Sequence, residues 1–169
     1  MKLPPYTIYP EISDDRVLLR QIQPSDIKHL IEISYYNAVQ AETETEAREM
    51  QDRIDKDYLN GNSIHWGIAD KLSDKIVGTC GYYRGFENAS GELGCVLLPM
   101  FRGKGYMSAA MQLAIDFGLS QMKLQRIWAA TNRDNLDAIK LLTRVNLQKL
   151  ANQNNLEEIE FELKMKSQI

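Results

Sequence analysis

The segment from Ile64 to Met122 constrains the fold more than any other part of the sequence. It begins with three short runs rich in Ile, Val, Tyr and Trp, separated by turn-forming residues. These runs are Ile64–Ala69, Lys75–Arg84 and Gly91–Leu98. Such runs predict an antiparallel meander. Pro99 ends the last run, and after the turn Arg102–Gly105 a helical pattern of apolar residues continues to about Met122.

The flanking segments predict further strands and helices. Before the meander we expect a strand at 16–22, a helix that begins near Pro24 and a second helix from about Thr43 to Leu59. After it we expect a strand at Gln125–Ala130, a helix at Asn135–Val145 and a hairpin that pairs Leu147–Ala151 with Glu157–Lys164 across Asn152–Asn155. This order predicts an α/β (α+β) fold with a mixed, mostly antiparallel seven-stranded sheet and helices on both faces. No linker separates the parts, so we expect a single domain over residues 1–169.

Composition excludes several classes of protein. With 20 basic and 23 acidic residues the net charge is -3, too balanced to predict binding to nucleic acid or to an anionic membrane surface. The two cysteines, Cys80 and Cys95, form no CxxC pair and lie in apolar runs, so we expect buried thiols, no disulfide framework and no metal site. The N-terminus lacks an apolar signal region, and every apolar run is too short to span a bilayer. We therefore expect a cytoplasmic protein, monomeric or homodimeric.

The turn after Pro99 has the chemistry of a phosphate site. Gly103 and Gly105 allow backbone torsions that other residues disfavour, and the helix that follows has unpaired N–H groups in its first turn. Those N–H groups and the helix dipole favour a diphosphate, and Arg102 and Lys104 add positive charge. The P-loop pattern GxxxxGK[ST] is absent, and Ser108 stands at the third position of GxGxxG. The alternative is a simple helix cap with exposed basic residues.

Beyond this chemistry, Pro99–Met107 resembles the acetyl-CoA signature Q/R-x-x-G-x-G/A of the GNAT superfamily of N-acetyltransferases. Arg102 and Gly105 match its first two fixed positions, and Met107 replaces the second glycine or alanine. The tripeptide Gly105–Met107 resembles the branch that acetylates the N-termini of ribosomal proteins. Further similar segments occur in the same order over about residues 14–165. They are Arg16–Arg20, Pro24–Asp26, Trp66–Asp70, Ile76–Thr79, Gly91–Gly94 and Asn135–Leu147.

This resemblance implies that acetyl-CoA is the co-substrate and that the acetyl group passes to an amine, either a protein N-terminus or a small molecule. It also implies a set of residues that bind the pantetheine arm and the diphosphate. They are Leu97, Leu98, Arg102, Gly103, Lys104, Gly105, Met107, Ser108 and Asn135. The family pattern has Gly and Phe where this chain has Asn146 and Leu147, and Asn tolerates the left-handed conformation of a helix end.

For catalysis, the resemblance implies that Glu92 is the general base, because it matches a carboxylate that some family members use. The alternative is a solvated residue at a strand edge. His65 is a second candidate, and His29 lies in a predicted surface helix. Ala138 and Leu142 stand where relatives carry a serine or a tyrosine, so no general acid is predicted. That gap raises a second hypothesis, a catalytically weak acyl-CoA-binding module, and a third is a scaffold without enzymatic activity.

Other residues near the expected site have ordinary explanations. Trp66, Tyr82 and Tyr83 either line the acceptor side or pack in the core, and we favour the core. We expect methionines 100, 107 and 111 to fill the core. The helix pair before the meander carries acidic residues suited to a cationic amine or to a solvated surface. They are Glu32, Glu42, Glu44, Glu46 and Glu49.

Overall fold

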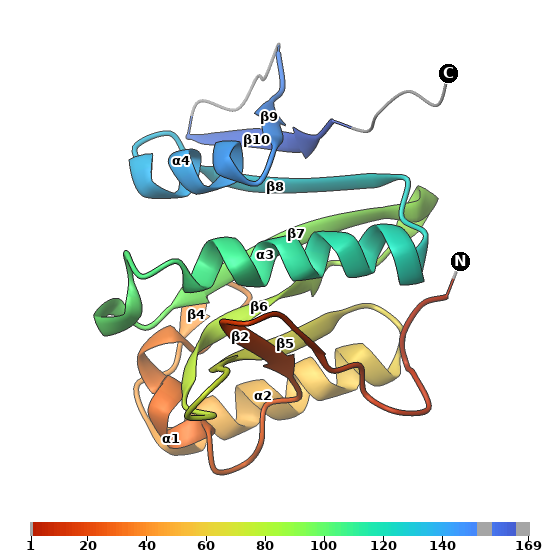
Figure 1. Cartoon of the computed structure of the whole chain (residues 1–169). Helices are drawn as coiled ribbons and strands as arrows, with labels where there is room; N and C mark the ends of the chain where they lie inside the picture. Colours follow the sequence, from red (N-terminus) through yellow and green to blue (C-terminus); the bar gives the residue numbers. More distant parts are fainter. Residues whose placement is uncertain (1, 152–156, 165–169) are drawn as a thin grey trace.

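One twisted sheet connects nearly the whole chain in the computed structural model, which describes residues 2–151 and 157–164. Within these residues the sheet has eight strands in the order β1-β2-β5-β6-β7-β8-β10-β9 (Figure 1). The strands are β1 (Ile12–Ser13), β2 (Val17–Arg20), β5 (Ile64–Asp70), β6 (Ile76–Tyr83), β7 (Ser90–Leu97), β8 (Arg126–Asn132), β9 (Leu147–Lys149) and β10 (Glu158–Leu163). Neighbouring strands are antiparallel except β7 and β8, which are parallel.

Helices cover both faces of the sheet, as the sequence predicts. They are α1 (Ile27–Leu30), α2 (Glu44–Leu59), α3 (Tyr106–Phe117) and α4 (Leu136–Arg144). Figure 1 shows α1 and α2 at one end of the molecule, α3 across its middle, and α4 beside β9 and β10 at the other end. In the described part of the chain, no helix is both long and apolar enough to cross a membrane.

Two buried clusters stabilise these layers. The larger one packs α3 and α4 against one face, with Trp66, Tyr82 and Met111 fully buried. The smaller one packs α1 and α2 against the other face and includes Leu30 and Ala47. Side chains alternate between the two faces along each strand, so His65 and Glu92 lie opposite Trp66 and Leu93.

All seven predicted strands are present in the sheet, and its eighth strand, β1, was not predicted. Strand β1 has only two residues, too few for a recognisable alternating pattern, and pairs with β2 through Ile12 and Leu19. The pairing of β9 with β10 confirms the final hairpin, for example between Leu147 and Leu163. The predicted turn at Asn152–Asn155 lies outside the described residues.

The region between α1 and α2 contains elements that the sequence did not predict. After one turn of α1, the chain makes a 3₁₀ turn at Ile31–Ile33 and then a small hairpin, β3 (Tyr35–Tyr36) and β4 (Val39–Gln40). Its two connecting residues, Asn37 and Ala38, both have positive φ angles, 49° and 63°. This is the turn geometry that two-residue hairpins favour, and it explains why the helical spacing stops at Ile33.

Capping residues set the ends of the helices. Thr43 caps α2 by accepting a hydrogen bond from the N–H of Glu46 at 3.2 Å. The predicted helix to Met122 consists of α3 and a π-helical turn at Gly118–Met122. Beside that turn the hydroxyl of Tyr82 donates to the carbonyl of Ala114 at 2.8 Å.

Candidate active site

The glycine turn between β7 and α3 has a backbone suited to the close approach of a ligand. Gly103 and Gly105 have φ angles of 72° and 82°, in the left-handed region that favours glycine. A Cβ atom at Gly103 would meet nothing within 4 Å, and one at Gly105 would lie 3.5 Å from the guanidinium of Arg16. Backbone conformation, not crowding, therefore restricts these positions to glycine, and the outer side of the turn is open.

The main-chain N–H groups of this turn are available to an anion. From Gly103 to Ser108 none of them donates a hydrogen bond to another residue in the described part of the chain. The next N–H group, that of Ala109, donates to the carbonyl of Gly105 at 3.3 Å. Gly105 is the N-cap of α3 and has no side chain to satisfy these groups. The positive end of the helix dipole lies here, so the turn favours a phosphate.

Four basic side chains surround the turn, and the sequence analysis identified only two of them. Arg102 and Lys104 belong to the turn and are exposed. Arg16 immediately precedes β2, and its Nη1 donates a hydrogen bond to the carbonyl of Lys104 at 2.7 Å. Arg144 reaches it from α4, and its Nη1 donates to Oγ of Ser108 at 3.3 Å. Arg16 and Arg144 belong to two of the segments that resemble the family, but both segments are distant from the turn in the chain, so nothing in the sequence placed these two side chains at it.

Strands β7 and β8 separate in the direction of the turn. They pair only from Ser90 to Glu92 on β7, opposite Arg126 to Trp128 on β8. Beyond that point β7 continues to Leu97 without another β8 partner. The sequence could not show this opening, because it depends on where a pairing between distant segments ends.

The main-chain groups along the opening differ in availability. The N–H of Leu98 donates to the carbonyl of Val77 at 2.9 Å, and its carbonyl accepts from Phe101 at 3.0 Å. Because hydrogen-bonding directions alternate along a strand, the main-chain groups of Cys95 and Leu97 point toward the opening instead. Of the two predicted pantetheine-binding residues, Leu97 has main-chain groups free for a ligand, whereas those of Leu98 are already engaged.

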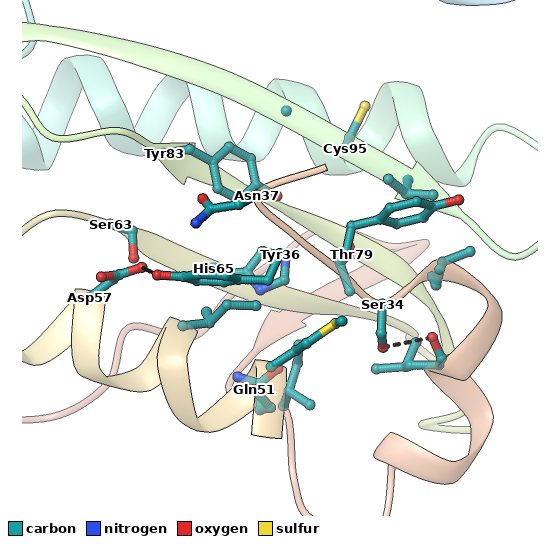
Figure 2. Close-up of a pocket in the computed structure, with 18 of the residues that line it drawn as sticks. Ser34, Tyr36, Asn37, Gln51, Asp57, Ser63, His65, Thr79, Tyr83 and Cys95 are labelled. Atoms are coloured by element: carbon teal, nitrogen blue, oxygen red, sulfur yellow. Dashed lines mark hydrogen bonds between the residues drawn. The ribbon is translucent and has the colours of Figure 1, made fainter. Parts of the chain in front are cut away.

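A cavity of about 580 Å³ lies on the α1–α2 side of the sheet, against β7 (Figure 2). Strands β5, β6 and β7 line one side, and α2 and the β3–β4 hairpin line the other. Apolar side chains such as Ile33, Met50 and Ile54 form much of its wall. Among its lining residues are two carboxylates, Glu92 and Asp57. The five acidic residues that we singled out in the helix pair do not line it.

Glu92 has the environment expected of a proton acceptor. It extends from β7 into the cavity, and its side chain is 13% exposed. Its Oε2 lies 3.4 Å from Nε of Arg84 but makes no hydrogen bond. Burial raises the pKa of Glu92, the attraction of Arg84 opposes this, and Glu158 and Glu160 raise the pKa further.

The other sequence candidates divide between the two faces of the sheet. His65 lines the cavity, and burial lowers its pKa from 6.5 to about 4. The ring centre of Tyr83 lies 5.5 Å from that of His65 in the same cavity. Trp66 and Tyr82 point to the opposite face and are fully buried in the core. His29 is exposed on α1, away from the cavity lining.

Comparison with known proteins identifies the family. The family model described as acetyltransferase (GNAT) domain matches residues 16–148 of this chain. The chain belongs to the GNAT acetyltransferase family. An N-acetyltransferase of Bacillus licheniformis, p20, is 32% identical over 140 residues, covering 82% of this chain and 76% of that protein.

Solved structures resemble this GNAT acetyltransferase in fold. A ribosomal-protein alanine acetyltransferase from Vibrio fischeri is similar with a TM-score of 0.71 and 21% identity, covering 94% of this chain and 98% of that one. A spermidine N-acetyltransferase from Vibrio cholerae has a TM-score of 0.69 and 15% identity, covering 88% and 92%. The two neighbours act on different amines, so the fold does not specify the acceptor of this GNAT acetyltransferase.

The two positions at which the resemblance implies a serine or a tyrosine, Ala138 and Leu142, lie on α4 and are apolar here. Asn135 caps α4, its Oδ1 accepting from the N–H of Ala138 at 3.1 Å. Leu142 is buried, and neither it nor Ala138 supplies a proton donor, because both side chains are hydrocarbons. The described residues contain no group of three or more His, Cys, Asp or Glu side chains that would hold a metal ion.

The methionine prediction was partly wrong. Met111 is fully buried and lies against Cys95, with 3.5 Å between the two sulfur atoms, and Met107 packs at the core edge. Met100, however, is 71% exposed, because it lies in the 3₁₀ turn between β7 and the glycine turn and belongs to neither buried cluster. Cys80 and Cys95 are free thiols, and the first is fully buried.

Proposed function

We propose that this 169-residue chain acts as one cytoplasmic domain that transfers an acetyl group from acetyl-CoA to a primary amine. The observation that carries this proposal is the position of Glu92. On one side of it β7 and β8 begin to separate toward the glycine turn, and on its other side lies the cavity. A carboxylate at the junction of a phosphate-binding turn and a second pocket is suited to a reaction between two bound substrates.

The turn and the opening would hold acetyl-CoA. Its diphosphate fits the open N–H groups from Gly103 to Ser108, with positive charge from Arg102, Lys104 and Arg144. Its pantetheine arm fits the unpaired edge of β7, where Cys95 and Leu97 offer main-chain groups. Bound acetyl-CoA supplies an activated thioester carbonyl.

Glu92 would prepare the amine. An amine bound in the cavity enters largely as an ammonium, and the carboxylate accepts its proton, directly or through water. The raised pKa of Glu92 makes it a better base than a carboxylate in water. An N–H group on the free edge of β7 polarises the carbonyl as the nitrogen attacks, the C–S bond breaks, and CoA leaves as a thiolate. With Ala138 and Leu142 apolar, the proton for that thiolate comes from solvent or from the attacking nitrogen.

The test is thermal unfolding with and without acetyl-CoA, followed by a thiol-release assay with a panel of amines. At about 100 times its Kd, acetyl-CoA should raise the melting temperature by roughly 5–10 °C. The variant Gly105→Glu should lose this rise, because it places a carboxylate and its bulk where the diphosphate binds. Gly85→Glu is the matched control, since Gly85 has the same φ of 82° and open space around it.

The two assays also separate the proposal from its alternatives. Stabilisation by acetyl-CoA without transfer to any amine would favour the catalytically weak acyl-CoA-binding module, which the absence of a donor at Ala138 and Leu142 supports. No stabilisation of the wild-type protein would contradict both and leave the scaffold hypothesis.

A further inference from the structure

Buried polar atoms without partners concentrate in the cavity. Within residues 2–151 and 157–164, four buried side-chain polar atoms make no hydrogen bond: Ser63 Oγ, His65 Nδ1, Ser90 Oγ and Glu92 Oε2. Three of the four residues, Ser63, His65 and Glu92, line the cavity. A buried polar atom that makes no hydrogen bond destabilises the fold, so a ligand that supplies the missing partner recovers that free energy. This indicates a ligand with more than one polar group.

These groups lie at two separate places in the cavity. Ser63 and His65 are at the start of β5, and Glu92 is on β7, with β6 between them. The pairs Ile64 with Tyr82 and Tyr83 with Glu92 place Ser63, Tyr83 and Glu92 in nearly one row across the strands. Two strand spacings separate the main chains of Ser63 and Glu92 by roughly 10 Å. One small polar group cannot satisfy both places.

The space between the two places is apolar and aromatic. Tyr83 extends over Gly94, where a Cβ atom would come within 2.6 Å of its ring. Met50 and Ile54 of α2 line the cavity on the side that faces the sheet. Figure 2 shows Tyr83, Ser63 and His65 on the sheet side and Asp57 and Gln51 on α2. The middle of the ligand is therefore an apolar body.

The charged side chains that line the cavity are Asp57, Arg84 and Glu92. Asp57, the second carboxylate, already accepts a hydrogen bond from the hydroxyl of Tyr36 at 3.1 Å. His65 is neutral near neutral pH, since burial lowers its pKa to about 4. The Oε2 of Glu92 makes no hydrogen bond, and Nε of Arg84 lies 3.4 Å from it. Two carboxylates and one guanidinium leave the cavity lining with one net negative charge, which one ammonium group would balance. At the end near β5, Ser63 and His65 offer the ligand a hydroxyl and a neutral imidazole.

We propose that the acceptor is a small primary amine with an aryl or alkyl body and one uncharged hydrogen-bonding group, such as a hydroxyl, at the end remote from the amine. Glu92 binds the amine, and Ser63 and His65 bind the remote group. This inference rests on the proposed function, because it assigns the acceptor of that reaction.

A matched pair of amines tests the inference. Tyramine and phenethylamine share a body and differ only in a terminal hydroxyl. With saturating acetyl-CoA, the full-length protein should use tyramine with a kcat/KM roughly tenfold above that for phenethylamine, the value of one buried hydrogen bond. Spermidine, which carries several positive charges, should be the poorer acceptor.

Three variants locate the effect. Ser63→Ala and His65→Phe should reduce the tyramine preference toward one, while Ser90→Ala should leave it unchanged. Ser90 is the matched control, because its hydroxyl is also buried and unpartnered but lies outside the cavity lining. Each variant removes an unpartnered polar atom, so its melting temperature should equal or exceed that of the wild type.

Calorimetric titration of each amine into the complex with CoA separates the two proposals. A hydroxyl preference in binding without any acetyl transfer would support the binding of the remote group by Ser63 and His65 and contradict the proposed function. Acetyl transfer with equal use of both amines, or with better use of spermidine or of a peptide N-terminus, would overturn this inference and leave the proposed function standing. Failure of both amines to bind or react would overturn it as well.

Discussion

The glycine turn and the cavity lie on either side of Glu92 but are built in different ways. The turn uses main-chain groups of one short segment, and its side chains add charge at the rim. The cavity uses side chains from α2, from the β3–β4 hairpin and from three strands. A main-chain site binds what all members of a family share, whereas a site of side chains can differ from one member to the next without a change of fold. The comparison predicts that changes in the two regions have separable effects.

The largest expected effect comes from Glu92→Gln. The variant keeps the size of the side chain but cannot accept a proton, so kcat should fall by about 10²–10⁴-fold. Affinity for acetyl-CoA, measured by calorimetry, should stay within error of the wild type. Glu87→Gln, at an exposed position just before β7, should change neither quantity. A loss of acetyl-CoA affinity in Glu92→Gln would show that the two regions are not separable.

The same variant carries a pH signature. Glu92 acts when it is deprotonated, so the wild-type rate should rise with pH through a pKa above the ordinary range of a glutamate. Residual activity of Glu92→Gln should lack this rise. An unchanged pH profile in the variant would assign the ionisation to another group.

A smaller effect is expected at the rim of the turn. Arg144→Gln removes the cation beside Ser108, so acetyl-CoA should bind roughly five- to tenfold more weakly, with a steeper loss at low salt. The kcat at saturation should not change, because Arg144 does not line the cavity. Lys140→Gln on the same helix is the matched control, since it removes the same charge from an exposed residue. Equal losses of acetyl-CoA affinity in both variants would indicate that the overall positive charge of α4 acts on the ligand, and not a direct contact with Arg144.

The smallest effect concerns stability in acid. The unfolded chain protonates His65 near pH 6.5, but the folded chain does so only near pH 4. Folding stability should therefore fall as the pH drops through this window and level off below it. The loss is at most about 3 kcal/mol, which is the free energy that corresponds to the difference between these two pKa values. Denaturant titrations of His65→Phe should show a smaller loss, and those of His29→Phe the wild-type loss.

Much of the fold could be predicted from local patterns. The meander, the helices α2 and α4 and the start of α3 follow from breakers, caps and apolar spacing within each segment. Strand β1 and the β3–β4 hairpin were missed, because two-residue strands carry no period that a sequence pattern can reveal. The predicted turn residues lie together, and Glu92 does face a cavity.

The acidic residues of the site were only partly evident from the sequence. The glutamates of the helix pair suited either a cationic amine or a solvated surface, and none of the five lines the cavity. Glu92 was predicted, but Asp57 of α2, which does line the cavity, was not singled out. His65 was a second candidate for the base, whereas a histidine with a pKa of about 4 is suited to hydrogen bonding near neutral pH. Each difference concerns the environment of a side chain, which depends on what packs against it.

The amino-acid sequence alone specifies the order of strands and helices and the glycine turn that opens α3, because those features depend on torsions and contacts within one short segment. Long-range packing specifies the rest of the site. It brings Arg16 to Lys104, 88 residues away, ends the pairing of β7 with β8 at Glu92, and places Ser63 and His65 in the same cavity as that carboxylate. Burial and charge act between segments that are distant in the chain, so their effects exist only once the sheet and its helices have assembled.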